Sequence, residues 1–347
     1  MHHTETIKRV LVVGGAGYVG SHMVLALRDA GYSIVVFDNL SRGFADSIGT
    51  SPLVVGDLRA PSDLDACFAE HRFDLVMHFA ALAYVGESVA MPELYYQNNV
   101  VGALNLLTAM RKHGVNRLVF SSSCATYGEP DSVPINEMHS QRPINPYGRT
   151  KLIVEQALVD YATVYDLQSV TLRYFNAAGC DPQWRVGERH DPETHLIPLV
   201  LAEALRLMRG GDPMATTLKV FGDDFSTKDG SCVRDYIHVS DLCRAHLLAA
   251  ERLLAGKTNN AEFYNLANGA GFSVLEVITA CREVTGLPIQ YQVVSRRAGD
   301  PAVLVGDASK AGDMLGWRPE ITAVRDVIQT AWQWMCSVGN LSVNKTI

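Results

Sequence analysis

The chain has few features that would stabilise it other than a hydrophobic core. Its seven cysteines are an odd number and contain no CxxC pair, so a disulfide framework or a zinc ribbon is not expected. No apolar run approaches the ~20 residues that a membrane helix needs. The first six residues carry no sign of a cleaved leader. We therefore expect a soluble globular protein in a reducing, cytoplasmic environment.

Positive charge is also in short supply. The 347 residues contain 30 Lys and Arg against 37 Asp and Glu, a formal net charge of -7. This balance argues against a nucleic acid or an anionic membrane as a partner held by bulk electrostatics. The hydrophobic fraction is 48%, enough for a sizeable core, and the length predicts two domains or one large one.

The first half of the chain alternates short β-branched runs with longer helical patterns. Six runs are almost wholly apolar, as expected for strands buried on both faces of a parallel sheet: 10–13, 34–37, 53–55, 75–79, 118–121 and 170–174. Amphipathic stretches predict helices at 19–30, 62–71, 92–113 and 147–165. This alternation predicts a doubly wound, Rossmann-like α/β fold that binds ligands at the carboxyl ends of its strands.

A glycine-rich turn follows the first expected strand. Gly14, Gly17 and Gly20 let the backbone turn tightly and approach a pyrophosphate, and the helix that begins there directs N–H groups toward it. Asp38 ends the second strand, where a carboxylate would accept hydrogen bonds from the adenosine ribose. A 2′-phosphate would meet this negative charge, so NAD is favoured over NADP. Asp57 and Leu58, after the third strand, are further candidates near the adenine.

The character of the sequence changes after residue 175. Residues 179–191 are polar and rich in turn formers, and a helix is expected at 195–209. Residues 263–266 read as a late strand that returns to the first sheet. We therefore predict an NAD-binding domain at 1–175 and a smaller α/β lobe at 176–340, with a segment near 233–266 returning to the first domain.

Tyr147 and Lys151 lie four residues apart on an expected helix, so they share one face. A phenol with a pKa near 10 is a poor base at neutral pH. A neighbouring ammonium and a positive nicotinamide ring would favour the phenolate, and the roughly 4 kcal/mol needed to lower the pKa by about 3 is within their reach. Ser123, in the serine-rich run after the fifth strand, could bond the same substrate hydroxyl. A chance helix pair is the alternative, which the dinucleotide turn disfavours.

Ordered motifs continue along nearly the whole chain, at 14–22, 38–40, 78–81, 85–88, 95–100, 121–128, 147–151, 173–176, 233–239, 296–300 and 315–319. With them the chain resembles the extended short-chain dehydrogenase/reductase family and, within it, the UDP-glucose 4-epimerases (UDP-galactose 4-epimerases). The resemblance implies reversible epimerisation at C4 of a UDP-sugar through a transient 4-keto sugar, with tightly bound NAD+ and no net redox change.

The resemblance also implies roles for individual residues. Tyr147 would remove the proton from the sugar 4-hydroxyl, Lys151 would bond the nicotinamide ribose, and Ser123 would bridge to the sugar. Further cofactor contacts would come from Gly14, Gly17, Tyr18, Val19, Gly20, Asp38, Asn39, Asp57, Leu58, Phe79, Ala80, Asn98, Ser121 and Phe175. Further substrate contacts would come from Asn176, His195, Leu196, Arg234, Arg297, Asp300 and Leu304.

Several side chains have a second interpretation. Arg234 and Arg297 suit a diphosphate through their fork geometry, but Arg234 could instead form an internal ion pair with Asp235. His238 is expected to be structural. No metal is expected, because no Cys, Asp or Glu constellation is seen to accompany His190 and His195.

The chain departs from the family pattern at two places. The lysine that often reaches the NAD pyrophosphate is absent, because residues 81–84 read Ala-Leu-Ala-Tyr. Leu304 stands where a bulky tyrosine tends to exclude N-acetylated sugars, so some tolerance of UDP-GlcNAc and UDP-GalNAc is expected.

Other functions stay open at this point. A nucleotide-sugar 4,6-dehydratase needs an Asp-Glu pair that residues 122–127 lack. Decarboxylation of UDP-glucuronate, or epimerisation of a UDP-pentose or UDP-uronate, is not excluded. A non-catalytic NAD-binding regulator would be expected to lose Tyr147 and Lys151. The family also implies a homodimer that pairs the helices at 92–113 and 147–165, although core packing explains their apolar residues equally well.

Overall fold

The computed structural model describes residues 7–258, 260–297 and 300–339. Its centre is a seven-stranded sheet in the order β10-β6-β5-β4-β1-β2-β3, and all neighbouring pairs are parallel. The strands are β1 (Arg9–Val13), β2 (Ser33–Asp38), β3 (Leu53–Val55), β4 (Leu75–His78), β5 (Arg117–Ser123), β6 (Gln168–Tyr174) and β10 (Ala261–Leu266). The doubly wound α/β prediction is confirmed.

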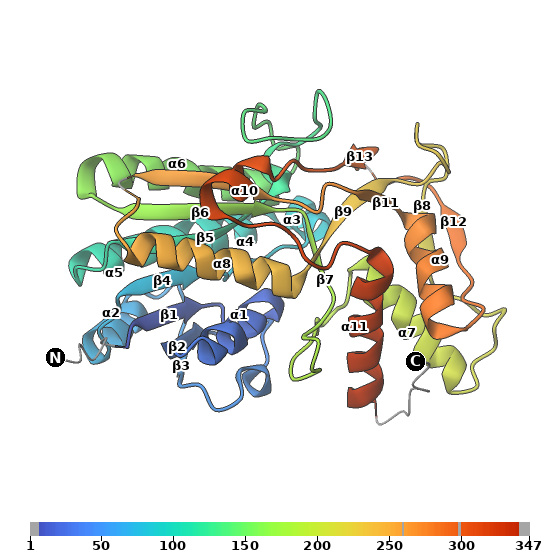
Figure 1. Cartoon of the computed structure of the whole chain (residues 1–347), viewed down its shortest axis with the longest axis horizontal. Coiled ribbons are helices and arrows are strands. Elements are labelled where there is room, and N and C mark those ends of the chain that lie inside the picture. The colour runs from blue at the N-terminus through green and yellow to red at the C-terminus, as the bar shows by residue number, and fades with distance from the viewer. Residues whose placement is uncertain (1–6, 259, 298–299, 340–347) are drawn as a thin grey trace.

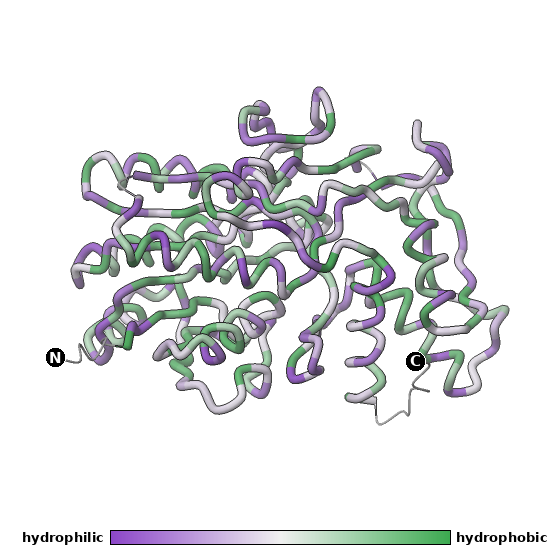
Figure 2. Tube along the Cα trace, viewed as in Figure 1, coloured by the Kyte–Doolittle hydropathy of each residue, from purple (hydrophilic) through white to green (hydrophobic). Residues whose placement is uncertain are grey.

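Burial on both faces explains why these strands lack polar alternation. Val10 and Val12 pack into one core, whereas Leu11 and Val13 pack into the core on the opposite face of the sheet. All four are fully buried, and each such side chain contributes about 1.5–3 kcal/mol of transfer free energy. Figure 2 shows the hydrophobic colouring that follows the central strands.

Helices cover both faces of the sheet (Figure 1). One layer contains α1 (Tyr18–Asp29) and α8 (Val239–Leu254), and the other contains α2 (Pro61–Glu70), α5 (Gly102–Lys112) and α6 (Pro146–Tyr165). Before α5 stand α3 (Val85–Ala90), α4 (Pro92–Tyr95) and η2 (Tyr96–Val101). The short helices η1 (Ala45–Ile48) and η3 (Cys124–Thr126) follow β2 and β5.

The single helix expected at 92–113 contains a π-helical turn at η2. This turn directs Asn98 toward the cavity described below, and Asn99 to the backbone of Leu82 and to Thr150. Such turns often mark functional sites, and nothing in the residue pattern announces this one.

The second lobe is built around β9 (Val233–His238). Its partners are β7 (Asn176–Ala178), β11 (Gly271–Ser273) and β13 (Val303–Leu304), and a separate pair is β8 (Lys219–Phe221) with β12 (Gln292–Val294). The helices α7 (Leu196–Met208), α9 (Val274–Thr285) and α11 (Val324–Val338) enclose a third core. The expected helix at 195–209 is thus confirmed as α7.

The chain passes between the lobes more than once. β10 pairs with β6, and α8 packs against α1, so both belong with the central sheet. β9 itself is hydrogen-bonded into the smaller sheet. After β11, α9, β12 and β13, the chain packs on β10 and α8 once more, at α10 (Ser309–Leu315). Among the described helices, none combines the length and the apolar character needed to cross a membrane.

Candidate active site

A cavity of about 100 Å³ lies where β1, β2, β3 and β4 end. Nine residues expected around the cofactor line it: Gly14, Gly17, Asp38, Asn39, Asp57, Leu58, Phe79, Ala80 and Asn98. These residues come from five separate segments of the sequence, which the parallel strands bring to one edge of the sheet. This edge is the place where doubly wound folds bind dinucleotides.

Two glycines make the close approaches that the turn requires. Gly14 has a φ of +78°, and a Cβ atom there would lie 2.3 Å from the backbone nitrogen of Ala80. A Cβ atom on Gly20 would lie 2.1 Å from the carbonyl oxygen of Gly14. Gly17 is the N-cap of α1, so the first N–H groups of the helix, including those of Tyr18 and Val19, open next to the cavity.

Asp38 is held rigidly by the turn. One of its carboxylate oxygens accepts from the backbone N–H of Ala16 at 2.9 Å, and the other accepts from that of Leu40 at 2.8 Å. Burial raises the pKa of Asp38, and these two hydrogen bonds oppose that rise. Each oxygen retains a free lone pair, so the pair could receive two ribose hydroxyls.

Arg42 is a cavity residue that the sequence did not single out. Its guanidinium pairs with Glu87 at 2.7 Å, donates to the carbonyl of Asp191 at 3.0 Å and lies 5.2 Å from the ring of Tyr84. It shares the cavity wall with Ala81 and Leu82, in the stretch that lacks the family's lysine. The sequence signal that could have identified Arg42 is its position shortly after the Asp38 carboxylate, which ends β2.

Tyr147, Lys151 and Ser123 converge at the start of α6 and the end of β5. Asn145 caps α6 by accepting from the N–H of Gly148 at 2.9 Å, which places Tyr147 in the first turn. One turn later, Lys151 donates to the carbonyl of Ser121 at 2.7 Å, and its Nζ lies 6.0 Å from the ring centre of Tyr147. The structure thus brings the three expected catalytic side chains together.

Neither Tyr147 nor Lys151 favours its charged form in these surroundings. Burial raises the pKa of Tyr147, Tyr174 adds to the rise, and a hydrogen bond with Ser123 opposes it. Burial lowers the pKa of Lys151 to about 7, against the attraction of Glu155. A further positive charge in the cavity would therefore be needed to favour the phenolate.

A buried ion pair lies beneath these residues. Arg173 and Glu155 meet at 2.7 Å with side chains that are 5% and 2% exposed. Ser122 also donates to Glu155, at 2.5 Å, and Arg173 donates to Tyr127 at 2.9 Å. This network joins α6 to β5 and β6, so it fixes the helix face that carries Tyr147 and Lys151.

Three further expected cofactor residues contact other parts of the protein. The Ser121 hydroxyl lies 2.9 Å from His246 on α8, and its carbonyl accepts from Lys151. Phe175 is buried against Gly306, where a Cβ atom would lie 2.3 Å from its ring. The Tyr18 hydroxyl donates to the carbonyl of Gly179 at 2.7 Å, so its side chain ties α1 to the second lobe.

The expected substrate residues line up along the second lobe. Arg234 lies 3.5 Å from Asp300 and donates to the carbonyl of Pro301 at 2.8 Å. Arg297 is exposed and stacks over the ring of Phe221 at 3.8 Å. Leu304 pairs with Arg234 in the sheet, so the residue expected to gate the sugar lies next to that arginine.

The alternative hypothesis of an ion pair between Arg234 and Asp235 is wrong. The carboxylate of Asp235 accepts instead from the backbone N–H groups of Asn268 at 2.8 Å and Gly269 at 3.0 Å, because the two side chains point to opposite faces of β9. Asn176 donates to the carbonyl of Asp235 at 3.0 Å.

The structure shows the contacts of the three histidines whose roles the sequence raised. His238 accepts from the N–H of Ser240 and contacts Thr330, each at 3.1 Å, which agrees with the structural role expected for it. His195 precedes Leu196 at the start of α7. The reason given against metal ligation by His190 and His195 is wrong, since Glu188 and Glu193 lie beside them. The sequence signal that would have indicated these four ligands is the Glu-x-His-x-x-Glu-x-His spacing of residues 188–195.

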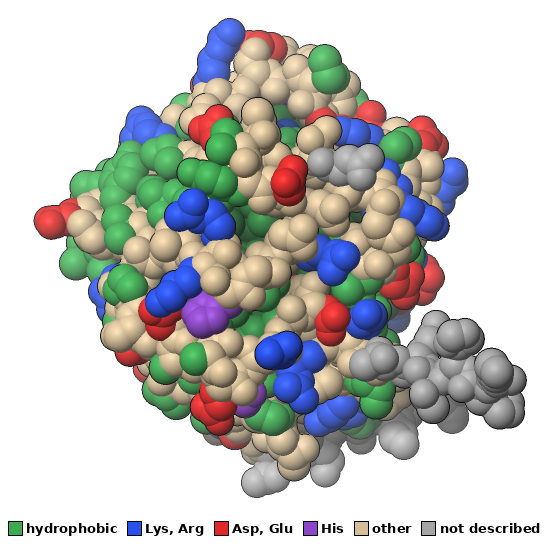
Figure 3. Space-filling model, turned by 90° about the vertical axis from the view of Figure 1, so that its left-hand side faces the viewer, with side chains coloured by type: hydrophobic (Ala, Val, Ile, Leu, Met, Phe, Trp, Pro, Cys, Tyr) green, Lys and Arg blue, Asp and Glu red, His purple; other side chains and the backbone are tan. Residues whose placement is uncertain are grey.

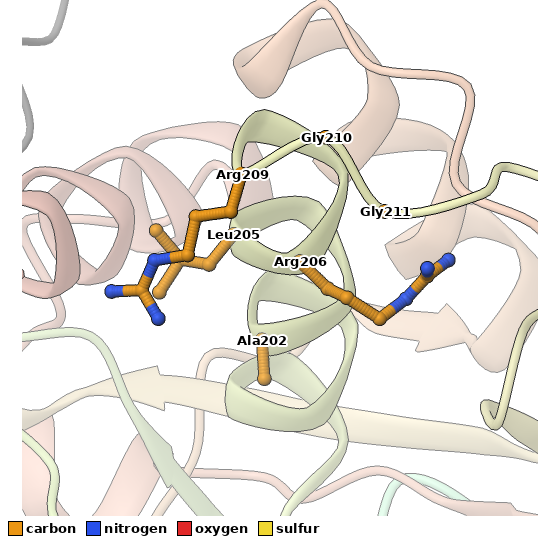
Figure 4. A pocket seen from close by; sticks show the side chains of 6 residues that line it. All are labelled: Ala202, Leu205, Arg206, Arg209, Gly210 and Gly211. Carbon is orange, nitrogen blue, oxygen red and sulfur yellow. The ribbon is translucent and has the colours of Figure 1, made fainter.

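A second hollow, of about 460 Å³, lies at the end of α7 (Figure 4). Figure 4 shows the side chains of Arg206 and Arg209 extending to opposite sides of this helix. Arg206 is already paired with Glu203 at 2.7 Å. The remaining lining is aliphatic or glycine, so this hollow offers no acid, base or nucleophile for a reaction.

Comparison with known proteins agrees with this geometry. Residues 10–267 match the model of the NAD dependent epimerase/dehydratase family. The chain is 51% identical to a UDP-glucose 4-epimerase of Rhizobium leguminosarum bv. trifolii over 325 residues, which is 94% of this chain and 96% of the relative.

Two solved structures are also similar. A UDP-glucose 4-epimerase from Brucella ovis in complex with NAD has a TM-score of 0.88 and 46% identity, covering 94% of this chain and 98% of that one. A UDP-glucose 4-epimerase from Bifidobacterium longum in complex with NAD+ and UDP has a TM-score of 0.89 and 37% identity, covering 96% and 99%. The chain therefore belongs to the NAD dependent epimerase/dehydratase family.

Proposed function

We propose that the protein interconverts UDP-glucose and UDP-galactose by reversible epimerisation at C4, with NAD+ as a bound cofactor. The observation that carries this proposal is the position of Tyr147, one helical turn before Lys151 and next to Ser123, beside a dinucleotide cavity. The similarity to relatives named UDP-glucose 4-epimerases supports the choice of substrate.

The residues present fit NAD. The Gly14 and Gly20 contacts leave no room for a side chain, so the pyrophosphate could approach the backbone directly. Asp38 would hold the adenosine ribose, and Arg42 would supply a cation near the diphosphate in place of the missing lysine. When bound, NAD+ accepts the C4 hydride and returns it.

The protein side chains manage the proton and the geometry. Tyr147, as phenolate, would take the proton of the sugar 4-hydroxyl and later return it. Lys151 would stabilise the phenolate and bond the nicotinamide ribose, because Ser121 fixes its ammonium at 2.7 Å. Ser123 would hold the same sugar hydroxyl. Because the hydrogen removed from C4 would be given back to C4, the reaction would consume no oxidant.

The UDP half would lie along the second lobe. Arg234 and Arg297 would face the diphosphate, since Arg234 is held by backbone carbonyls and Arg297 lies over Phe221. Asp300 would bond the uridine ribose, and Asn176, His195 and Leu196 would contact the phosphates at the start of α7. Leu304 lies beside Arg234 and is smaller than tyrosine, so it would admit an N-acetyl group.

We also propose a domain division and a homodimer. Residues 7–175, with α8, β10 and α10, form the cofactor lobe, and the remaining described residues of 176–339 form the substrate lobe. α6 exposes Ile153, Val159 and Val164, and Figure 3 shows a hydrophobic patch at the end of the molecule where α5 and α6 lie. A second copy pairing the same helices would cover these side chains.

The test is incubation of purified protein with UDP-galactose, without added NAD, followed by chromatography of the nucleotide sugars. UDP-glucose should form while no reduced nicotinamide accumulates. If there is no conversion, a repeat with NAD separates loss of cofactor from lack of activity. No conversion with NAD present would overturn the proposal.

A further inference from the structure

Two histidines and two glutamates gather between β7 and α7, in the segment that passes between the lobes (Figure 1). Glu188, His190, Glu193 and His195 each offer one ligand atom, and these four atoms lie within 4.8 Å of one another. The four residues fall within eight positions of the chain, so a short loop assembles the group.

The spacing of the atoms approaches that of a tetrahedral metal site. Bonds of about 2.0–2.1 Å to zinc place neighbouring ligand atoms about 3.3 Å apart. His190 Nδ1 lies 3.3 Å from Oε2 of Glu193 and 3.5 Å from Oε1 of Glu188. His195 Nδ1 lies 3.9 Å from the other oxygen of Glu193, Oε1. The pair formed by His195 Nδ1 and Glu188 Oε1, at 2.6 Å, would open by about 0.7 Å around an ion.

Charge in this group is unbalanced without a cation. Glu188 is buried, and within the described part of the chain the ion-pair partners of Glu188 and Glu193 are histidines rather than Lys or Arg. With neutral imidazoles the group would carry two negative charges. Either two protons or one divalent cation would neutralise it, and the four ligand atoms lie close enough together to share one cation.

The surroundings hold the ligands in place. Glu193 accepts from the backbone N–H groups of Thr194 at 2.7 Å and His195 at 2.8 Å through one oxygen, which leaves its other oxygen beside His190. The ring of Tyr18 lies edge-on to His190 at 5.9 Å, and that of Tyr84 lies edge-on to His195 at 6.4 Å. Ligating carboxylates that are hydrogen-bonded in this way are typical of built metal sites.

We propose that Glu188, His190, Glu193 and His195 bind one divalent transition-metal ion, with Zn²⁺ the best match to two imidazoles and two carboxylates in a four-coordinate site. With four protein ligands the site is closed, so its role is structural. The ion fastens residues 188–195 beside Tyr18 and Tyr84 of the cofactor lobe. His195 uses Nδ1 here and keeps Nε2 free. This inference does not depend on the proposed epimerase activity.

The test uses the metal alone. Full-length protein is treated with a chelator, desalted and titrated with Zn²⁺ by calorimetry, and in parallel with Co²⁺ by visible absorption. One ion per chain should bind at micromolar concentration or below, with the strong visible bands of four-coordinate Co²⁺. Saturation only at millimolar metal, or the weak spectrum of six-coordinate Co²⁺, would overturn the site.

Two variants locate the ion. His190→Asn and Glu193→Gln should each weaken Zn²⁺ binding by at least about tenfold. His71→Asn is the matched control, because His71 also neighbours a glutamate, Glu70 at 3.9 Å, but belongs to no group of metal ligands among the described residues. A second control replaces His2 and His3 by alanine, because these two consecutive histidines are another pair that could bind the metal. Equal affinity in His190→Asn, Glu193→Gln and the unmodified protein would assign the metal elsewhere and overturn the proposal.

Discussion

The cofactor cavity is assembled from the ends of neighbouring parallel strands, whereas the substrate side draws on β7, the start of α7, β9, β13, Arg297 and Asp300. On the cofactor side, most functional residues follow a strand or open a helix, as Gly14 follows β1 and Asp38 ends β2. On the substrate side, Arg234 and Asp300 lie 66 positions apart and meet at 3.5 Å only through the fold. The residues of a site built at strand ends can be predicted from the local sequence, whereas those of a site built from distant segments cannot.

The largest effect is expected on the cofactor side, from Tyr147→Phe. The fold should persist while turnover falls by roughly 10²–10⁴-fold, because only the phenolic oxygen that moves the proton is lost. Tyr165→Phe, on the same helix with an exposed ring, is the matched control and should retain turnover. The loss of turnover is measured as steady-state rates with UDP-galactose. Near-normal activity in Tyr147→Phe would exclude this residue as the base.

Breaking the buried pair beneath the site should mainly reduce stability. Glu155→Gln leaves the Arg173 guanidinium buried without its carboxylate, so unfolding should cost about 3–5 kcal/mol less. Denaturant titration measures this directly. The surface pair of Lys112 with Asp65 is the comparison, and Asp65→Asn should change stability far less. Equal effects would mean that the buried network does not support α6.

A substitution on the substrate side should alter selectivity rather than chemistry. Leu304→Tyr would fill the space beside Arg234, so turnover of UDP-GlcNAc should fall about 10–200-fold relative to UDP-galactose. The ratio of kcat/KM for the two sugars is the measurement. An unchanged ratio, or no turnover of UDP-GlcNAc by the unmodified protein, would remove Leu304 as the gate.

The smallest effect is expected from Arg42→Ala, which removes the cation proposed to replace the missing lysine. Retention of NAD should weaken roughly tenfold, as expected for loss of a charge-assisted hydrogen bond. Arg189→Ala is the control, because Arg189 likewise pairs with a carboxylate, Asp46 at 2.8 Å, and covers the ring of Phe44. Equal NAD affinity in both variants, measured by fluorescence titration, would exclude Arg42.

The sequence allowed the central sheet to be predicted because its strands are buried on both faces and bounded by helical patterns. The turn at Gly14, the carboxylate of Asp38 and the Tyr147–Lys151 spacing each depend on short-range geometry, so they were visible without a structure. The π-helical turn at η2 was not, since no residue type demands it. The Arg173–Glu155 pair and the partners of Asp235 depend on tertiary packing, which a linear pattern does not reveal.

The Glu188–His195 group teaches a different lesson. Glu188 and Glu193 are close in sequence to the histidines, but a polar stretch rich in turn formers gives no sign that they share a site with them. Only the fold of the loop shows that the four ligand atoms lie within 4.8 Å of one another. Spacing of ligands within a loop therefore needs to be examined even where no helix or strand organises it.

The most direct test of the central claim follows the hydrogen on C4. UDP-galactose carrying deuterium at C4 is incubated with the protein in ordinary water, and the UDP-glucose formed is examined by mass spectrometry and NMR. Retention of deuterium at C4 is predicted, because the hydride leaves and returns within one closed site while Tyr147 handles only the hydroxyl proton. Loss of the deuterium to water would contradict transient oxidation at C4.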